Sequence, residues 1–449
     1  MDLTGTGSGL RRRRLLRAAL AVGGVSGFTA CVQLSDGFDV PAGTDDLSTY
    51  PTAQFAWNDA LVTDPHGNTV APHYQLMLFL RYTGPVPPMD PDRKTVESAF
   101  RTIERAFQRG TGGNPDALSL NGLLMCVGYS PDYFARFDDP LPDGIDLPQP
   151  EAVLRAIDED EEKADHHDAV VLLTSDRVEV LLAAEQALRG NRDTVNSVAV
   201  SGSLSDVFSV AERRTGFKGQ GLVSSKLAEH AGIDAVHEES PSAMGYKSGF
   251  SDNQATESQV TIEEGPFAGG STLHISELGF DLDAWYDLPE SERVDRMFSP
   301  DHTPEQVGEV GKFLASDSRV SEDHAEAAVD HAIDRGVVGH TQKLARARDD
   351  DFEPKLLRRS EAISAADGDA ALNFTSLQRR IDDFVETRRA MTEIDFDSDE
   401  ESDVTGCPIH NAAESGCPVD NGILSFIETR HRANFLVPPR NRRALPRPQ

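Results

Sequence analysis

Positive charge is scarce in this sequence. Its 449 residues include 43 Lys and Arg against 75 Asp and Glu, a formal net charge of −32, and only eight of the basic residues are Lys. A nucleic-acid partner held by a basic face is therefore excluded, because binding phosphate requires a positive surface. An acidic surface that is poor in Lys is typical of proteins adapted to high salt, in which carboxylates keep the chain hydrated and soluble.

Cysteine is also scarce, with four residues in the chain. Cys126 lies in an apolar stretch and is expected to be a buried thiol. Cys407 and Cys417 frame a short stretch that contains His410. Outside the cytosol a disulfide between these two cysteines is the favoured interpretation. A metal site with His410 is the alternative, although a structural zinc site needs four ligands and no second cluster is visible.

No hydrophobic run reaches the roughly 20 residues that a membrane-spanning helix needs. The basic stretch 11–17 is followed by a short apolar run over residues 18–30, which together indicate a signal peptide. The pattern of residues 12–17 resembles the twin-arginine export signal, and residues 28–31 resemble a lipobox. We therefore expect export by the twin-arginine route and a lipid anchor at Cys31 on the outer face of the cell membrane. The alternative is an N-terminal anchor helix that is never cleaved.

Several common catalytic motifs are missing. There is no nucleotide-binding Gly pattern, Walker loop, Gly-x-Ser-x-Gly or His-Glu-x-x-His. No repeat of 20 to 50 residues is present, which excludes solenoids and propellers. His166 and His167 are adjacent at the start of an expected strand, so their side chains should point to opposite faces. They are poor joint ligands, and a surface pair is the favoured interpretation.

The hydrophobic pattern predicts an α+β fold with two halves. In the first half the expected order is β-α-β-β-α-β, the ferredoxin-like arrangement, with strands at 75–82, 123–129, 168–174 and 195–200 and helices at 94–109 and 177–188. In the second half we expect strands at 271–275 and 370–377 and helices at 304–314, 322–334 and 378–391. The acidic stretch 393–403 is expected to be an exposed hinge. The basic, Pro-rich end is expected to be an arm that lies across the acidic body.

These features divide the chain into five expected segments. They are a signal peptide over 1–31, a tether over 32–72, a first ferredoxin-like domain over 73–210, a second over 211–395, and a hinge, Cys loop and C-terminal arm over 396–449.

Three groups of residues in the second half resemble a known family. They are 245–253, which is followed by glycines in 265–271; 339–343 with 356–360; and 369–378. In their order and spacing they resemble the dye-decolourising peroxidases, over roughly residues 73–391. The resemblance implies two ferredoxin-like domains of the dimeric α/β barrel type, with antiparallel sheets and a haem b pocket in the second.

The resemblance also assigns roles to individual residues. The family's Gly-x-x-Asp-Gly motif falls on Gly245 to Gly249, with Lys247 inside it, and implies that Gly245, Lys247 and Gly249 adjoin the cofactor. His340 would be the proximal iron ligand and Arg358 the distal arginine. An imidazole can hold haem iron on one face, and a fixed guanidinium can stabilise negative charge as an O–O bond breaks.

Apolar residues of one expected strand complete the implied pocket. Leu372 and Phe374 would line the haem.

Each motif alone also has a purely structural interpretation. The glycines could serve a turn, His340 could be a histidine at a strand edge, and the arginines could pair with nearby acids.

One departure from the family concerns the distal acid–base group. The family's distal Asp is Ser248 here, and a hydroxyl cannot act as a base near neutral pH. We expect either Asp252, four residues later, or Arg358 with water to take over this role.

The sequence therefore predicts an exported haem b peroxidase that reduces hydrogen peroxide and oxidises a small-molecule or dye-like donor. The alternative is a non-catalytic haem- or iron-handling lipoprotein of the same fold, and a third interpretation is a relic fold without cofactor at the cell surface. Neither a nucleic acid nor any membrane contact beyond the lipid anchor is expected, and the oligomeric state stays open.

Overall fold

The computed structural model describes residues 40–110, 121–230, 236–364, 369–392 and 421–449. The expected signal peptide with Cys31, the acidic stretch 393–403 and the loop with Cys407 and Cys417 lie outside the described residues. Within the described ranges no helix combines the length and the hydrophobicity of a membrane span.

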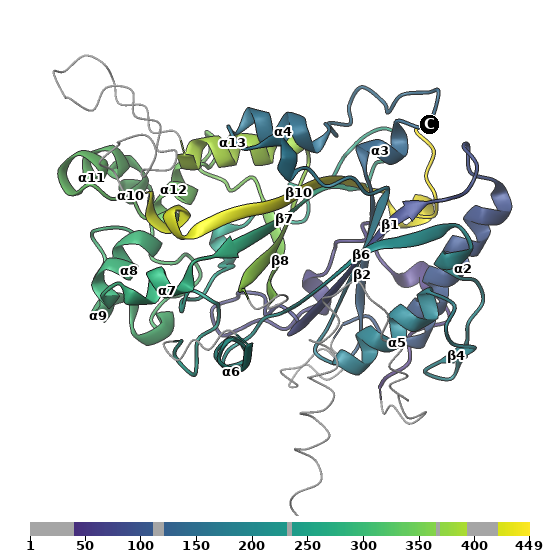
Figure 1. The fold of residues 1–449 in the computed structure, drawn as a ribbon, viewed down its shortest axis with the longest axis horizontal. Coiled ribbons are helices and arrows are strands. Elements are labelled where there is room, and N and C mark those ends of the chain that lie inside the picture. Colours follow the sequence, from purple (N-terminus) through teal and green to yellow (C-terminus); the bar gives the residue numbers. More distant parts are fainter. Residues whose placement is uncertain (1–39, 111–120, 231–235, 365–368, 393–420) are drawn as a thin grey trace, which may run out of the picture.

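Eight antiparallel strands form a closed barrel at the centre of the molecule (Figure 1). Around the barrel their order is β1-β3-β2-β10-β7-β9-β8-β6. The bounds of these strands are β1 Tyr74–Tyr82, β2 Leu124–Tyr129, β3 Ala169–Ser175, β6 Phe208–Phe217, β7 Ser271–Phe280, β8 Leu357–Ser364, β9 Ala371–Gln378 and β10 Ile427–Val437.

The barrel consists of two ferredoxin-like halves, as the sequence predicts. In the first half β1, α2 (Asp90–Ala106), β2, β3, α5 (Val178–Leu188) and β6 follow one another, and the sheet order is β6-β1-β3-β2. The second half repeats this order as β10-β7-β9-β8, with α13 (Ile381–Thr392) preceding its last strand. The pairs β2–β10 and β6–β8 join the two halves.

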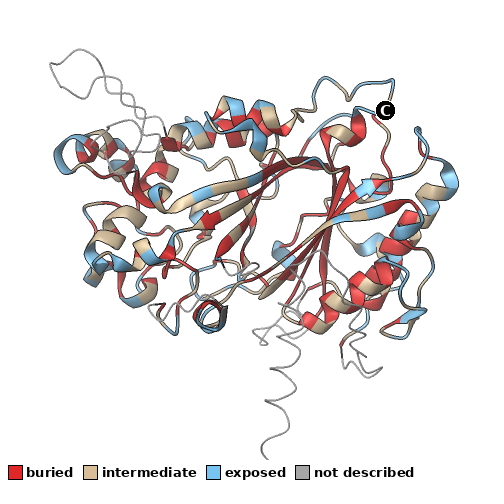
Figure 2. Cartoon of the chain, viewed as in Figure 1, coloured by how far each residue is buried: buried red, intermediate tan, exposed pale blue. Residues whose placement is uncertain are grey.

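The alternation of side chains along each strand separates two apolar cores. On β1, Leu76 and Leu78 pack with the helices α2 and α5, whereas Met77 and Phe79 pack with residues of the other strands inside the barrel. Cys126 is buried in this interior core as a free thiol, as expected. Buried residues accordingly concentrate on the strands and on the inward faces of the helices, which leaves the outer faces to solvent (Figure 2).

The expected tether is a structural part of the barrel from Val40 onward. Phe55 and Trp57 are almost completely buried and belong to the interior core. Gln54 donates to the carbonyl of Pro438 (2.8 Å) and accepts from the amide of Val127 (3.1 Å), so the segment is pinned between strands of both halves. The segment expected as a tether therefore settles onto the barrel and contributes two aromatic side chains to its interior.

Two further expectations about segments are corrected. Residues 195–200 are not the fourth strand of the first sheet, because they hold only the short hairpin of β4 (Thr194–Val195) and β5 (Val198–Ala199). The fourth strand is β6, which crosses the expected domain boundary at residue 210. The first residues of the expected C-terminal arm belong to β10. Only the residues after this strand lie against helix α2, where Arg443 pairs with Glu104 (2.6 Å).

Shorter helices fill the connections, and several are broken where a single helix was expected. Residues 322–334 form two helices rather than one, and 304–314 hold only one short α-helix. The remaining helices are α3 Pro131–Phe134, α4 Pro150–Ala156, α6 Leu222–His230, α7 Leu282–Asp287, α8 Glu290–Met297, α9 Pro304–Val307, α10 Glu322–Glu326, α11 Ala328–Arg335 and α12 His340–Arg346.

A buried ion cluster ties three of these elements together. Glu159, which follows α4, binds Arg432 of β10 through two hydrogen bonds of 2.6 and 2.7 Å and lies 3.3 Å from Arg388 of α13. Burial opposes ionisation of Glu159, but its attraction to Arg432, the hydrogen bonds and Arg388 outweigh burial and lower its pKa to about 2. The carboxylate thus fixes α13 and the α4 segment against the sheet.

The Glu159→Gln variant tests this cluster through the pH dependence of stability. A carboxyl group whose pKa is lower in the folded than in the unfolded state stabilises the fold above its unfolded pKa, and this contribution is lost as pH falls through the folded value. We expect the difference in free energy of unfolding between the wild type and the variant to shrink by about 3 kcal/mol as the pH falls from about 6 to about 2. Denaturant unfolding across this range provides the measurement.

Glu162→Gln is the matched control, because Glu162 is exposed and lies only three residues away. A difference between wild type and Glu159→Gln that does not change with pH would show that the carboxylate is not held ionised by the two arginines.

Candidate functional site

A cavity of about 600 Å³ lies on the outer face of the second half's sheet. Its floor is formed by residues of β7, β8, β9 and β10, and α12, α13 and the loop 242–253 surround it. This volume is near the middle of the range of about 300–1,000 Å³ found for small-molecule and cofactor sites. The cavity therefore lies in the half of the chain where the sequence places a haem pocket.

His340 lines this cavity as the first residue of α12. The helix begins there because Gly339 has an extended backbone and its amide donates to the side chain of Gln342 (3.3 Å). A Cβ on Gly339 would come within 1.9 Å of the carbonyl oxygen of Phe298, so only glycine fits at this position. Lys343, one turn later, is fully buried and donates to the carbonyl of Asn421 (2.6 Å). The imidazole of His340 thus projects from a helix end that is held by the close contact of Gly339 with Phe298 and by the bond from Lys343 to Asn421.

Arg358 lines the same cavity from β8. Its backbone amide donates to Gln254 (3.0 Å), and a β-bulge separates Arg358 from Ser360 in the pairing of β8 with β9. Arg359, at the bulge, lies on the other side and binds the carbonyl of Phe55 (2.8 Å), far from the cavity lining. The alternation of side chains along β8 therefore places the first arginine of the pair at the cavity and the second against the N-terminal segment inside the barrel.

The loop 242–253 brings Lys247, Ser248 and Gly249 to the cavity wall. Gly245 and Gly249 have φ values of +91° and +74°, which explains the glycines at both ends of the motif. Gly245 itself is not in the wall, although its neighbours Met244 and Tyr246 are. Burial raises the pKa of Tyr246 to about 12, so this phenol stays protonated.

Asp252 does not lie in the cavity wall, contrary to the expectation that it replaces the family's distal Asp. Its carboxylate accepts a hydrogen bond from Ser316 (2.6 Å) on the far side of the loop. Asn253, the next residue, does reach the wall, where its side chain is held by Ser318 (2.7 Å) and Arg348 (2.9 Å). Asp252 is therefore not placed to exchange protons with a ligand.

Apolar side chains of the sheet form the floor. Leu372 and Phe374 of β9 line the cavity, as the sequence predicts, and both are only half-buried although β9 lies between two other strands. Phe280 of β7 and Ile363 of β8 extend this apolar surface. A flat aromatic ligand would find an apolar wall here.

The cavity is positively charged although the protein is acidic. The described side chains that line it include seven cations against four carboxylates, whereas the whole chain has a formal charge of −32. The cations are Lys163, Lys247, Arg348, Lys355, Arg358, Arg388 and Arg432, and the carboxylates are Asp158, Glu159, Asp160 and Glu428. Two carboxylates outside the wall reduce this excess of three to one, because Lys247 pairs with Asp64 (2.5 Å) and Lys355 with Glu386 (2.8 Å). The remaining positive charge in an apolar recess favours an anionic ligand.

Arg348 is a cavity residue that sequence reasoning missed. Its guanidinium donates to the carbonyl oxygens of Phe352 (3.1 Å) and Asp252 (2.8 Å) and to the side-chain oxygen of Asn253. All three acceptors are neutral, so these bonds fix the guanidinium without cancelling its charge, and burial lowers its pKa. Only its position shortly after His340 could have pointed to it in the sequence.

The residues of this cavity fit a haem. The imidazole of His340 and the guanidinium of Arg358 line the same recess, which also has apolar side chains on its floor. Fixed cations such as Lys247 and Arg348 are available for carboxylate groups of a ligand. Lys247 also pairs with Asp64 (2.5 Å), which links the site loop to the N-terminal segment. Burial opposes ionisation of Asp64, but hydrogen bonds from Lys247 and Asn68 lower its pKa to about 2.

Comparison with known structures agrees with this architecture. The encapsulated DyP-type peroxidase of Mycobacterium smegmatis is similar with a TM-score of 0.50 and 12% sequence identity, over 86% of this chain and 99% of that one. A dye-decolorizing protein of V. cholerae gives a TM-score of 0.49 at 15% identity, over 86% and 98% of the two chains. Rhodococcus jostii DypB, solved as a variant in complex with haem, gives 0.48 at 15% identity, over 83% and 95%.

No curated protein matches the sequence. The model of a family of unknown function, DUF7405, matches residues 72–439, which include the whole barrel. The chain therefore belongs to the DUF7405 family of unknown function, and its fold is that of the dye-decolourising peroxidases.

Proposed function

We propose that this protein is a haem b peroxidase that reduces hydrogen peroxide and oxidises a small-molecule or dye-like donor. The observation that carries the proposal is the shared cavity of His340 and Arg358, which is positively charged within a strongly acidic chain. The fold likeness to the DyP-type peroxidase of Mycobacterium smegmatis supports the same assignment.

Particular residues would hold the cofactor. His340 would ligate the iron, Leu372 and Phe374 would contact the ring, and Lys247 and Arg348 would pair with its carboxylates. A bound haem would supply the redox-active iron that peroxide chemistry requires.

The chain itself would supply electrostatics and positioning. The guanidinium of Arg358 would stabilise negative charge on the oxygen that leaves as the O–O bond of peroxide breaks. The hydroxyl of Ser248 can donate or accept a hydrogen bond but cannot take up a proton near neutral pH, and Tyr246 stays protonated. Proton movement would then depend on water held by Arg358 and Ser248.

A second candidate function is a non-catalytic haem- or iron-handling protein with the same fold. It is favoured by the absence of a carboxylate from the part of loop 242–253 that lines the cavity, because Ser248 stands at the family's Asp position and Asp252 is turned to Ser316. The two candidates share the cofactor and differ in turnover.

We also propose export by the twin-arginine route and a lipid anchor at Cys31. The support is the sequence of residues 11–31 alone. The acidic composition agrees with a salty environment outside the cell.

Haem binding is tested by absorption spectroscopy of the protein matured with haem. We expect a Soret band whose position or intensity changes in His340→Ala, because the iron loses its protein ligand. His237→Ala is the control, since His237 is partly exposed, pairs with Glu309 and lies outside the cavity wall. The proposal fails if the wild type shows no Soret band, or if His340→Ala leaves the band unchanged.

Turnover is tested with peroxide and a dye under steady-state conditions. We expect Arg358→Leu to lower kcat/KM by about 10²–10³-fold, the effect of removing one donor that stabilises a developing oxyanion. Ser248→Asp should raise the rate by about 10²-fold, because it restores a proton-accepting group. Arg379→Leu, which changes an exposed arginine outside the cavity wall, should be neutral. Haem bound without peroxide consumption in the wild type would instead identify the carrier.

A further inference from the structure

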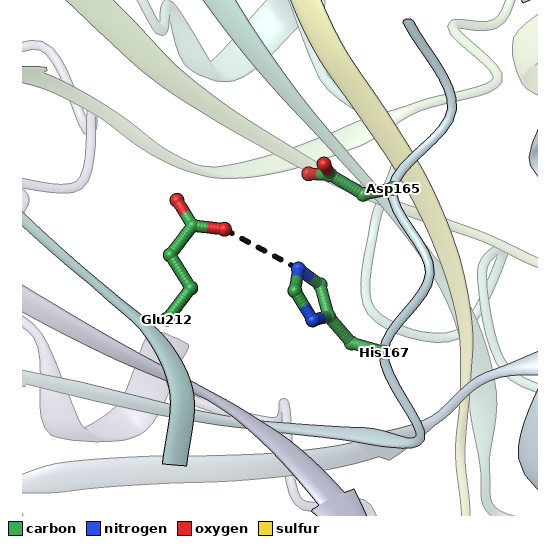
Figure 3. A group of neighbouring side chains, drawn as sticks. All are labelled: Asp165, His167 and Glu212. Carbon is green, nitrogen blue, oxygen red and sulfur yellow. Dashed lines mark ion pairs between the residues drawn. The ribbon is translucent and has the colours of Figure 1, made fainter. Parts of the chain in front are cut away.

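A cluster of metal-ligating side chains lies at one end of the barrel interior, away from the cavity. Asp165 and His167 precede β3, and Glu212 belongs to β6 (Figure 3). The ring of His167 packs against Phe79, a member of the interior core, with 4.8 Å between the ring centres. Glu212 pairs with Phe79 in the sheet register. In Figure 3, Asp165 and His167 extend from one segment and Glu212 from a facing strand, with their polar ends directed to the space between them.

The spacing of their ligand atoms matches a metal centre. Nε2 of His167 lies 3.3 Å from Oε2 of Glu212. Two ligands on one ion, each at about 2.0–2.2 Å, lie roughly 3.0–3.4 Å apart, so this pair already has the required separation. One ligand atom from each of the three residues lies within 4.8 Å of the others.

The imidazole of His167 is poorly satisfied in this setting. Its side chain is only 11% exposed, and neither ring nitrogen makes a hydrogen bond of good geometry to the described residues. A buried polar group left in this state costs about 1–3 kcal/mol. His166 shows the opposite environment, because its side chain is half exposed and pairs with Asp132 (2.9 Å) and Glu151 (3.0 Å). The two histidines point to opposite faces as predicted, but the interpretation as a surface pair is wrong for His167.

The charged side chains around the cluster determine whether it can accommodate a cation. Arg214 binds Asp165 (2.6 Å) and Glu212 (2.5 Å) and lies 3.2 Å from Glu277, which in turn lies 3.9 Å from Arg430. Three carboxylates therefore face two guanidinium groups and the imidazole of His431 beside Asp165, so the cluster has an excess of one negative charge when this imidazole is neutral.

The bonds to Arg214 do not exhaust the carboxylates. A carboxylate has about four lone-pair sites, so each of the two groups can still accept a metal ion. His431 lies 3.1 Å from the second oxygen of Asp165 and is a further imidazole within reach of the cluster.

We propose that Asp165, His167 and Glu212 bind one divalent first-row transition ion, with Arg214 as the residue that orients both carboxylates. One imidazole nitrogen and two carboxylate oxygens suit Zn²⁺, Co²⁺ or Mn²⁺ better than Ca²⁺, which prefers oxygen ligands alone. Three protein ligands leave at least one position for water or a small anion. The site does not depend on the haem, because Glu277 faces the barrel whereas its neighbours Ser276 and Leu278 face the cavity.

Titration of the haem-free full chain with Co²⁺ tests the proposal. The experiment uses a Cys31→Ser/Cys407→Ser/Cys417→Ser background, so that thiolates outside the described residues cannot bind the probe. We expect one equivalent of Co²⁺ with d–d absorption and no sulfur-to-cobalt charge-transfer band. His167→Gln and Glu212→Gln should each weaken binding at least tenfold, whereas the adjacent control His166→Gln should bind as the background protein does.

Thermal unfolding gives an independent readout. Zn²⁺ should raise the Tm of the background protein and of His166→Gln, because an ion that binds only the folded state stabilises it, and should leave the Tm of Glu212→Gln unchanged. Two results would overturn the proposal. One is that the background protein binds no stoichiometric metal, and the other is that His167→Gln and Glu212→Gln bind it as tightly as the background protein does. Since Glu212→Gln keeps the size of the side chain, it remains informative if His167→Gln does not fold.

Discussion

The pairing of β10 with β7 and β2 is the interaction on which the rest of this structure depends. Leu436 pairs with Tyr129, so the last strand of the chain closes a barrel that begins with β1. The same strand carries Arg432 to Glu159 and provides part of the cavity floor. Because β7 and β10 separate the barrel interior from the cavity, one sheet presents an apolar core on one face and the candidate haem site on the other.

The charge of the cavity wall is opposite in sign to the net charge of the whole chain. Carboxylates dominate the chain, yet in the cavity wall cations outnumber them. Arg348 is held by neutral oxygens, and Arg388 and Arg432 share the single carboxylate of Glu159. Placing cations in an apolar recess has a desolvation cost that only fixed hydrogen bonds can offset. Such an arrangement suits an anionic ligand, and it is the feature that most distinguishes this recess from the surrounding surface.

The sequence was most informative where periodicity or a motif was local. The first β-α-β-β-α unit follows from hydrophobic spacing, and the positions of His340, Arg358, Leu372 and Phe374 in one cavity follow from the family resemblance. It was least informative about segments whose position depends on contacts with residues distant in the chain. Nothing local shows that residues 55–57 enter the barrel or that β6 and β10 are strands, since their polar outer faces mask the alternation. Asp252 was misplaced because loop conformation, not spacing, determines which side chain faces the cavity.

The positions of the two tryptophans have a consequence for spectroscopy. Trp57 is enclosed in the barrel interior beneath the guanidinium of Arg359, whereas Trp285 lies behind the site loop and donates to the carbonyl of Met244 (3.1 Å). The chain contains no other tryptophan. Its intrinsic fluorescence therefore has two sources in separate cores. Single-tryptophan variants would distinguish loosening of the barrel from rearrangement around the cavity without any external label.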